Sequence, residues 1–101
     1  MKLRAYLLCI LLLSGVVHLA GQDLTPTDSL RQLISDHPKE DTARVNLMTA
    51  LAKSFLNQNL DSAEFYYNKS LKASLDLKYT DGQINSMNGL GVCFWYKNNT
   101  K

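Results

Sequence analysis

The chain has few of the residue types from which catalytic and metal sites are built. Its 101 residues include only two histidines and two cysteines. His18 lies in the N-terminal apolar region and His37 stands directly before a proline, with no second ligand at metal-binding spacing. Ser70 and Ser74 are not part of any recognisable nucleophile arrangement. We therefore expect no enzymatic activity, no metal site and no cofactor.

An excess of charge of one sign is also absent. The chain has 11 basic and 9 acidic residues. Removal of residues 1–21 would take Lys2 and Arg4 with it and leave the remainder close to neutral. This balance argues against electrostatic binding of nucleic acid. It would also leave Cys93 as the single cysteine, which excludes an internal disulfide and favours a free, buried thiol.

The sequence contains no apolar run long enough to suggest a membrane-spanning helix, which needs roughly 18 residues. The longest run extends over 13 uncharged residues from Ala5 to Val17, after a start that carries Lys2 and Arg4. A basic start, a short apolar run and a small-residue tail are typical of a secretory signal peptide. We assign residues 1–21 to this signal, with an uncleaved anchor as the alternative. Cleavage after Ala20 or after Gly21 stays open.

Turn and cap residues then divide the chain into helices. Thr25 can cap a short helix, Pro26 suits its first position, and Asp28 favours its positive end. Residues 37–40 end this helix, because Pro38 restrains the residue before it from helical geometry. We interpret residues 22–40 as a linker that contains this short helix. No segment has the alternating pattern of a β-strand.

Two further helices follow, and each carries an apolar stripe. Asp41 can cap the first of them, which residues 57–59 end. Its stripe consists of Val45, Met48, Leu51, Ala52 and Phe55. Asp61 can open the next helix with Glu64 as its capping-box partner. Its stripe consists of Ala63, Tyr67, Ser70, Leu71 and Leu75.

The last helix repeats the pattern of the helix that follows Asp41. Residues 78–82 interrupt the chain, and Thr80 with Gln83 can form a second capping box. The stripe that follows consists of Ile84, Met87, Leu90, Gly91 and Phe94. Each member lies 39 residues after a residue of similar size in the stripe that begins with Val45. Five matched positions at one constant offset indicate an internal repeat.

The repeated pattern resembles the tetratricopeptide repeat (TPR). Leu51-Ala52-x-x-Phe55 is followed, after a polar turn, by Ala63-x-x-x-Tyr67-x-x-Ser70, and the pattern restarts at Leu90-Gly91-x-x-Phe94. The resemblance implies an all-α fold of antiparallel helical hairpins of α-solenoid type. It implies that small residues lie where two helices approach closely, and that aromatic residues fill the space between layers. It therefore assigns thirteen stripe residues to repeat packing: Val45, Met48, Leu51, Ala52, Phe55, Ala63, Tyr67, Ser70, Ile84, Met87, Leu90, Gly91 and Phe94.

The resemblance covers residues 41–101, with one full repeat at about 41–79 and the first helix of a second at about 81–97. Its period of 39 residues exceeds the usual value of about 34, and no proline closes the repeat. The stretch of residues 74–96 is similar to the longer repeats found in exported regions of bacterial signalling proteins. Because such repeats are stable only in stacks of about three or more, we expect the sequence to be an N-terminal fragment, with a truncated gene product or an unstable small protein as the alternatives.

The resemblance implies a function in binding a protein or a peptide, with no nucleic acid and no evident small-molecule substrate as partner. The first helix of each repeat normally lines the concave surface of a solenoid, which nominates Asn46, Lys53, Asn85 and Asn88 as partner-binding residues. We expect an exported module, periplasmic or anchored in the membrane facing the periplasm. The alternative is the sensory N-terminal part of a membrane-bound histidine kinase, with membrane attachment through segments that would follow Lys101.

Overall fold

The computed structural model describes residues 24–99 and shows an all-α arrangement, as the sequence predicts. Four helices follow one another: α2 at Pro26–Asp36, α3 at Thr42–Ser54, α4 at Leu60–Asp76 and α5 at Thr80–Asn99. The described residues contain no β-strand. The predicted signal peptide of residues 1–21 lies outside the described residues.

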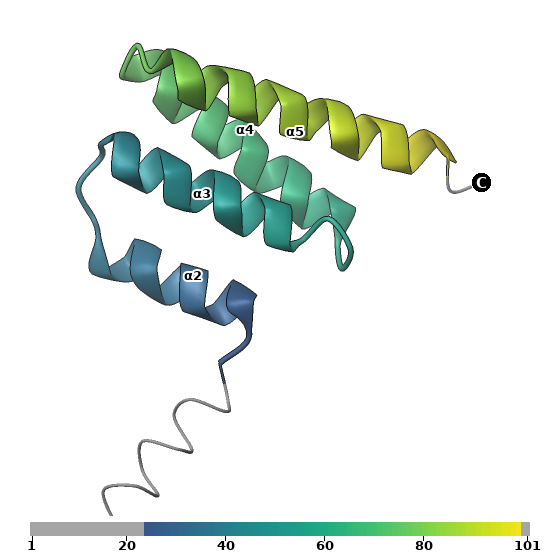
Figure 1. Cartoon of the computed structure of the whole chain (residues 1–101), viewed down its shortest axis with the longest axis horizontal. Coiled ribbons are helices and arrows are strands. Elements are labelled where there is room, and N and C mark those ends of the chain that lie inside the picture. The colour runs from purple at the N-terminus through teal and green to yellow at the C-terminus, as the bar shows by residue number, and fades with distance from the viewer. Residues whose placement is uncertain (1–23, 100–101) are drawn as a thin grey trace, which may run out of the picture.

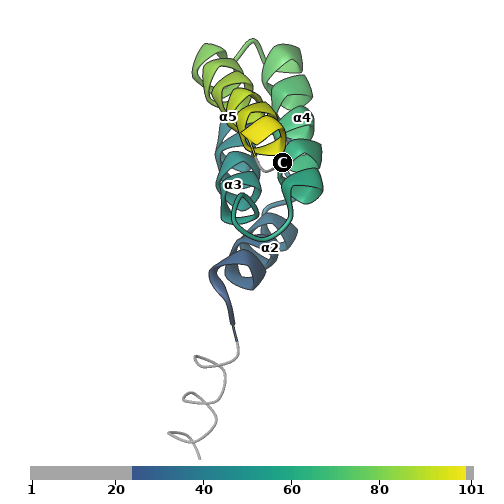
Figure 2. The same ribbon diagram turned by 90° about the vertical axis from the view of Figure 1, so that its right-hand side faces the viewer.

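The helices form an open stack in which each element runs antiparallel to the one before it (Figure 1). Helix α3 packs against α2, α4 and α5, and α4 also packs against α5. The end-on view shows α3 and α5 on one side of the stack and α4 on the other (Figure 2). Helix α4 thus packs against both α3 and α5, which also contact each other. A groove can therefore open between α3 and α5 on the side away from α4.

Side-chain caps fix the beginnings of the first three described helices. The Thr25 side chain accepts a hydrogen bond from the backbone N–H of Asp28, and Pro26 occupies the first position of α2, as predicted. Asp41 caps α3 as predicted, by accepting from the N–H of Arg44. Helix α4 departs from the prediction, because its cap is Asn59 rather than Asp61. An asparagine two residues upstream supplies the same acceptor and lengthens the helix.

The turn between α4 and α5 depends on one residue with left-handed backbone geometry. Lys78 has a φ angle of 54°, the only positive φ of a non-glycine residue among residues 24–99. The N–H of Tyr79 donates to the carbonyl of Ser74 across this turn, at 2.8 Å. The Gln83 side chain also donates to that carbonyl, at 3.4 Å, instead of forming the predicted capping box with Thr80. This tight turn folds α5 directly back along α4.

The core lies at the junction of α3, α4 and α5. Its central cluster combines Leu51, Ala52, Phe55, Ala63, Tyr67 and Cys93. All eight positions that the sequence assigns to packing on α3 and α4, from Val45 to Ser70, are buried. Burial of the larger of these side chains contributes roughly 1.5–3 kcal/mol each and supplies most of the stabilisation.

Helix α2 belongs to this packed unit, whereas the sequence suggests a linker. Thr27 is buried and its hydroxyl donates to the hydroxyl of Ser54 on α3 at 3.0 Å. Leu30 and Ile34 pack against the core cluster, and the Arg31 guanidinium lies 5.3 Å from the centre of the Phe55 ring. The short apolar stripe of α2 therefore suffices to attach the helix to α3.

On α5 the structure buries a different face from the one that the repeat alignment predicts. Ile84, Met87 and Phe94 are 51, 60 and 71% exposed, Gly91 is exposed, and Leu90 is half-buried. The buried face instead consists of Gly82, Ser86, Gly89 and Cys93. Small residues are required there because α5 lies close to its neighbours: a Cβ at Gly82 would overlap Ser74 of α4 and Val45 of α3, and the hydroxyls of Ser86 and Ser70 are 2.6 Å apart. The close approach expected at Gly91 occurs at Gly89, where a Cβ atom would overlap the Tyr67 ring.

Candidate functional site

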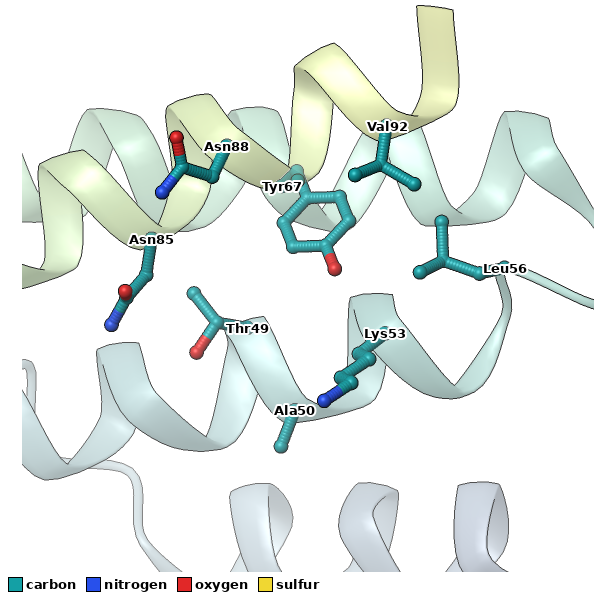
Figure 3. A pocket seen from close by; sticks show the side chains of 9 residues that line it. Thr49, Ala50, Lys53, Leu56, Tyr67, Asn85, Asn88 and Val92 are labelled. Carbon is teal, nitrogen blue, oxygen red and sulfur yellow. The ribbon is translucent and has the colours of Figure 1, made fainter. Parts of the chain in front are cut away.

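A groove of about 380 Å³ opens between α3 and α5 (Figure 3). Its sides come from the exposed edges of these two helices and its floor comes from α4, which lies behind them. The lining residues are Thr49, Ala50, Lys53, Leu56, Tyr67, Asn85, Asn88, Gly89 and Val92. Apolar contacts therefore alternate with amide, hydroxyl and ammonium groups along one open channel.

Tyr67 forms the floor of this groove. Its side chain is only 5% exposed, and its ring lies directly beneath Gly89. The hydroxyl points into the groove between the two helices (Figure 3), and no residue of the described part of the chain hydrogen-bonds to it. Burial, followed by the neighbouring Cys93 thiol, raises the pKa of Tyr67 above its ordinary value of 10.0. The groove thus presents a neutral hydroxyl that can donate or accept a hydrogen bond.

Three of the four predicted partner-binding residues meet at the groove. Lys53 contributes from α3, and Asn85 and Asn88 contribute from α5 (Figure 3). Within residues 24–99, Lys53 forms no ion pair, so its ammonium group is available to an acceptor. Asn46 lies outside this group, because its side-chain oxygen accepts a hydrogen bond from the Tyr79 hydroxyl at 3.0 Å. Asn46 therefore supports the α4–α5 turn rather than the groove.

Sequence reasoning missed the central residue of the site. Tyr67 has the spacing of a core residue and is buried, yet its hydroxyl points into the groove between α3 and α5. Thr49, Leu56 and Val92 also line the groove without having been singled out. The sequence holds no local signal for this contact, because only the structure shows that Gly89 lies opposite the Tyr67 ring.

A second groove, of about 460 Å³, lies on the opposite side of α5, between α5 and α4. It is lined by Glu64, Asn68, Leu90, Phe94, Lys97 and Asn98. At its end the Lys97 ammonium contacts Asp61 at 2.8 Å and Glu64 at 2.5 Å. Hydrogen bonds with Asp61 and then Glu64 raise the pKa of Lys97, so this lysine stays charged and ties the end of α5 to the start of α4.

The remaining reactive side chains are engaged in structure. His37 Nε2 lies 2.8 Å from an Asp41 oxygen, in the loop before α3. The Cys93 thiol is buried, and its pKa is raised by that burial and then by the charge of Glu64. In residues 24–99, no cluster of three or more histidine, cysteine, aspartate and glutamate side chains could hold a metal ion. None of the described helices has the length and apolar character needed to cross a membrane.

Comparisons with models of protein families, with curated proteins and with solved structures found no match for this chain.

Proposed function

We propose that this protein is an exported TPR-type module that binds a segment of another protein in the α3–α5 groove and has no catalytic activity of its own. The observation that carries the proposal is the Tyr67 hydroxyl. A side chain that is 95% buried, with its polar atom aimed into an open groove and left without a partner, is a vacant hydrogen-bonding position.

The TPR resemblance supports the same surface by a separate route. It places the first helix of each repeat on the concave side of a solenoid, and by the resemblance α3 and α5 would be those first helices. The groove lies between them and is lined by both. The resemblance alone therefore selects the surface at which the unpartnered hydroxyl is found.

The groove chemistry favours a peptide in an extended conformation. The side-chain amides of Asn85 and Asn88 can each donate and accept, as a peptide backbone requires. Ala50, Leu56 and Val92 supply apolar surface for side chains of the bound segment, and Lys53 supplies one positive charge. Such a surface binds through a few hydrogen bonds and modest apolar burial, which is typical of transient protein interactions.

Selection of random dodecapeptides displayed on phage against the immobilised full chain tests this proposal. Selected peptides are then titrated against the variants Tyr67→Phe and Asn88→Ala by fluorescence anisotropy. Loss of one net hydrogen bond should weaken binding about 2- to 10-fold in each variant. Tyr66→Phe is the matched control, because Tyr66 directly precedes Tyr67 in α4 but stacks on Phe55 and does not line the groove.

The expected result is weaker binding to Tyr67→Phe and Asn88→Ala with unchanged binding to Tyr66→Phe. A selection that yields no peptide contradicts the proposal. Equal affinity for the unmodified chain and for both groove variants also contradicts it, since binding would then take place elsewhere on the surface.

A further inference from the structure

The α3–α5 groove changes from polar to apolar along its length. Thr49 of α3 and Asn85 of α5 lie at one end, Leu56 and Val92 lie at the other, and the Tyr67 hydroxyl lies between them (Figure 3). Leu56 and Val92 each follow the polar residue on their side of the groove by seven positions. At 1.5 Å per helical residue the two ends are about 10 Å apart. The groove therefore offers two chemically different contacts at a defined spacing.

The polar end presents hydrogen-bonding groups that the fold does not use. The Thr49 hydroxyl donates to the carbonyl of Asn46 at 2.9 Å, which leaves its oxygen able to accept. In the described part of the chain the side-chain amide of Asn85 has no hydrogen-bond partner, so it can donate and accept. Beyond this end α3 and α5 come into close contact, since a Cβ at Gly82 would lie 2.9 Å from a methyl carbon of Val45. The groove therefore ends at its polar side.

The other end is lined by aliphatic side chains. Leu56 is half-buried and packs against the core cluster, and Val92 is 39% exposed. Neither side chain has a hydrogen-bonding group. An aliphatic side chain of a bound segment that lies between them is removed from water, which is favourable in proportion to the apolar area buried. This end therefore selects by apolar burial.

We infer that the groove selects segments in which a polar residue and an aliphatic residue are about three positions apart. The polar residue, with a hydroxyl or amide group, lies between Thr49 and Asn85, and the aliphatic residue lies between Leu56 and Val92. An extended chain of polyproline II type advances about 3.1 Å per residue and places side chains three positions apart on the same side. Such a chain spans the distance between the two ends, with its backbone over the Tyr67 hydroxyl. This inference rests on the proposed function and adds the sequence pattern of the bound segment to it.

Exchange of the two linings tests the inference, with the full chain and the peptides selected on it. Peptides selected on the unmodified chain should contain the polar–x–x–aliphatic pattern. Val92→Asn replaces the aliphatic lining by an amide, and Asn85→Leu replaces the amide by an aliphatic side chain. Both residues are exposed, so neither change removes core packing. Peptides selected on Val92→Asn should lose the aliphatic residue, and those selected on Asn85→Leu should carry an aliphatic residue in place of the polar one.

Titration by fluorescence anisotropy measures the contact at the apolar end. Replacement of the aliphatic residue of a selected peptide by serine should weaken binding to the unmodified chain about tenfold. The same replacement should weaken binding to Val92→Asn about threefold or less, because the apolar contact is already lost in that variant. Leu33→Asn is the matched control, because Leu33 is an exposed aliphatic residue of α2 outside the groove. This control should show the full loss.

The sequence pattern together with this coupling to Val92 supports the inference. Peptides that require the Tyr67 hydroxyl but lack the pattern overturn the inference and leave the proposed function standing. An equal loss of affinity for the serine peptide on the unmodified chain and on Val92→Asn does the same. A selection without any peptide, or peptides whose binding Tyr67→Phe does not change, overturns both.

Discussion

Substitution of alanine at Gly89 and at Gly91 compares two glycines that are two residues apart on α5 and have opposite surroundings. A Cβ at Gly89 would overlap the ring of Tyr67, whereas a Cβ at Gly91 would meet no atom within 4 Å. The Tyr67 ring cannot move aside easily, because it is packed in the cluster formed by Leu51, Ala52 and their neighbours. The same chemical change is therefore expected to have opposite effects on stability.

The magnitudes follow from two opposing contributions. Replacement of a glycine by alanine in a helix interior stabilises by about 0.8–1 kcal/mol. At Gly91 this gain stands alone, so Gly91→Ala should raise the free energy of unfolding by about that amount. At Gly89 overpacking costs about 1–3 kcal/mol and offsets or exceeds the gain. The two variants should therefore differ by about 1–3 kcal/mol, with Gly89→Ala the less stable.

Urea unfolding followed by circular dichroism measures this difference directly, and thermal unfolding provides a second measurement. A difference of 1 kcal/mol corresponds to about 4–8 °C in Tm for a domain of this size. An equal increase in stability for both variants would refute the reasoning, since it would show that α5 does not rest on Tyr67 through Gly89. A loss of stability in Gly91→Ala would instead show that the exposed face is already covered in solution.

Two further predictions concern acid stability and export. The backbone N–H of Arg44, and then the His37 side chain, lower the pKa of Asp41 below its ordinary 3.8. The stabilisation from this cap is therefore complete above pH 3.8 and is lost as the pH falls through the lowered pKa. Asp41→Asn keeps a capping acceptor but cannot titrate. Its Tm should therefore fall less steeply than that of the unmodified chain from neutral to acidic pH. Parallel dependences of Tm on pH for the two proteins would contradict this. In a Gram-negative host, the periplasmic product should lack residues 1–21 on N-terminal sequencing. Cytoplasmic material that begins at Met1 would exclude the signal.

Local sequence signals predicted most of the helical framework. Cap residues and Pro26 located the starts of α2 and α3. The apolar stripes of α3 and α4 identified buried residues up to Ser70, but Leu71 is only partly buried and Leu75 is 55% exposed. Such features are readable because capping and helical periodicity depend on residues close together in the chain. The cap of α4 was placed two residues late because asparagine and aspartate supply equivalent acceptors.

The buried face of α5 could not be read in the same way. Periodicity selects the largest apolar residues, and on α5 these lie around Gly91 on the exposed side. The buried residues there are small because Tyr67 and the closely packed α4 leave little space, a tertiary constraint without a local signal. Lys53, Asn85 and Asn88, which the sequence nominates for partner binding, line one groove in the structure. The orientation of the Tyr67 hydroxyl toward that groove depends on how α3, α4 and α5 pack together, which no local pattern shows.

The contact between Gly89 and Tyr67 has a consequence for the entropy of binding. A tyrosine on a protein surface samples several rotamers, and a ligand that fixes one of them loses part of its binding free energy to that restriction. Here the α5 backbone lies across the ring and the core encloses its remaining sides, so the hydroxyl has one position before any ligand arrives. The side-chain conformational entropy of Tyr67 is therefore already lost on folding, before any ligand binds. The floor of the groove is therefore preorganised, and a bound segment has to order only itself and the exposed side chains of the rim.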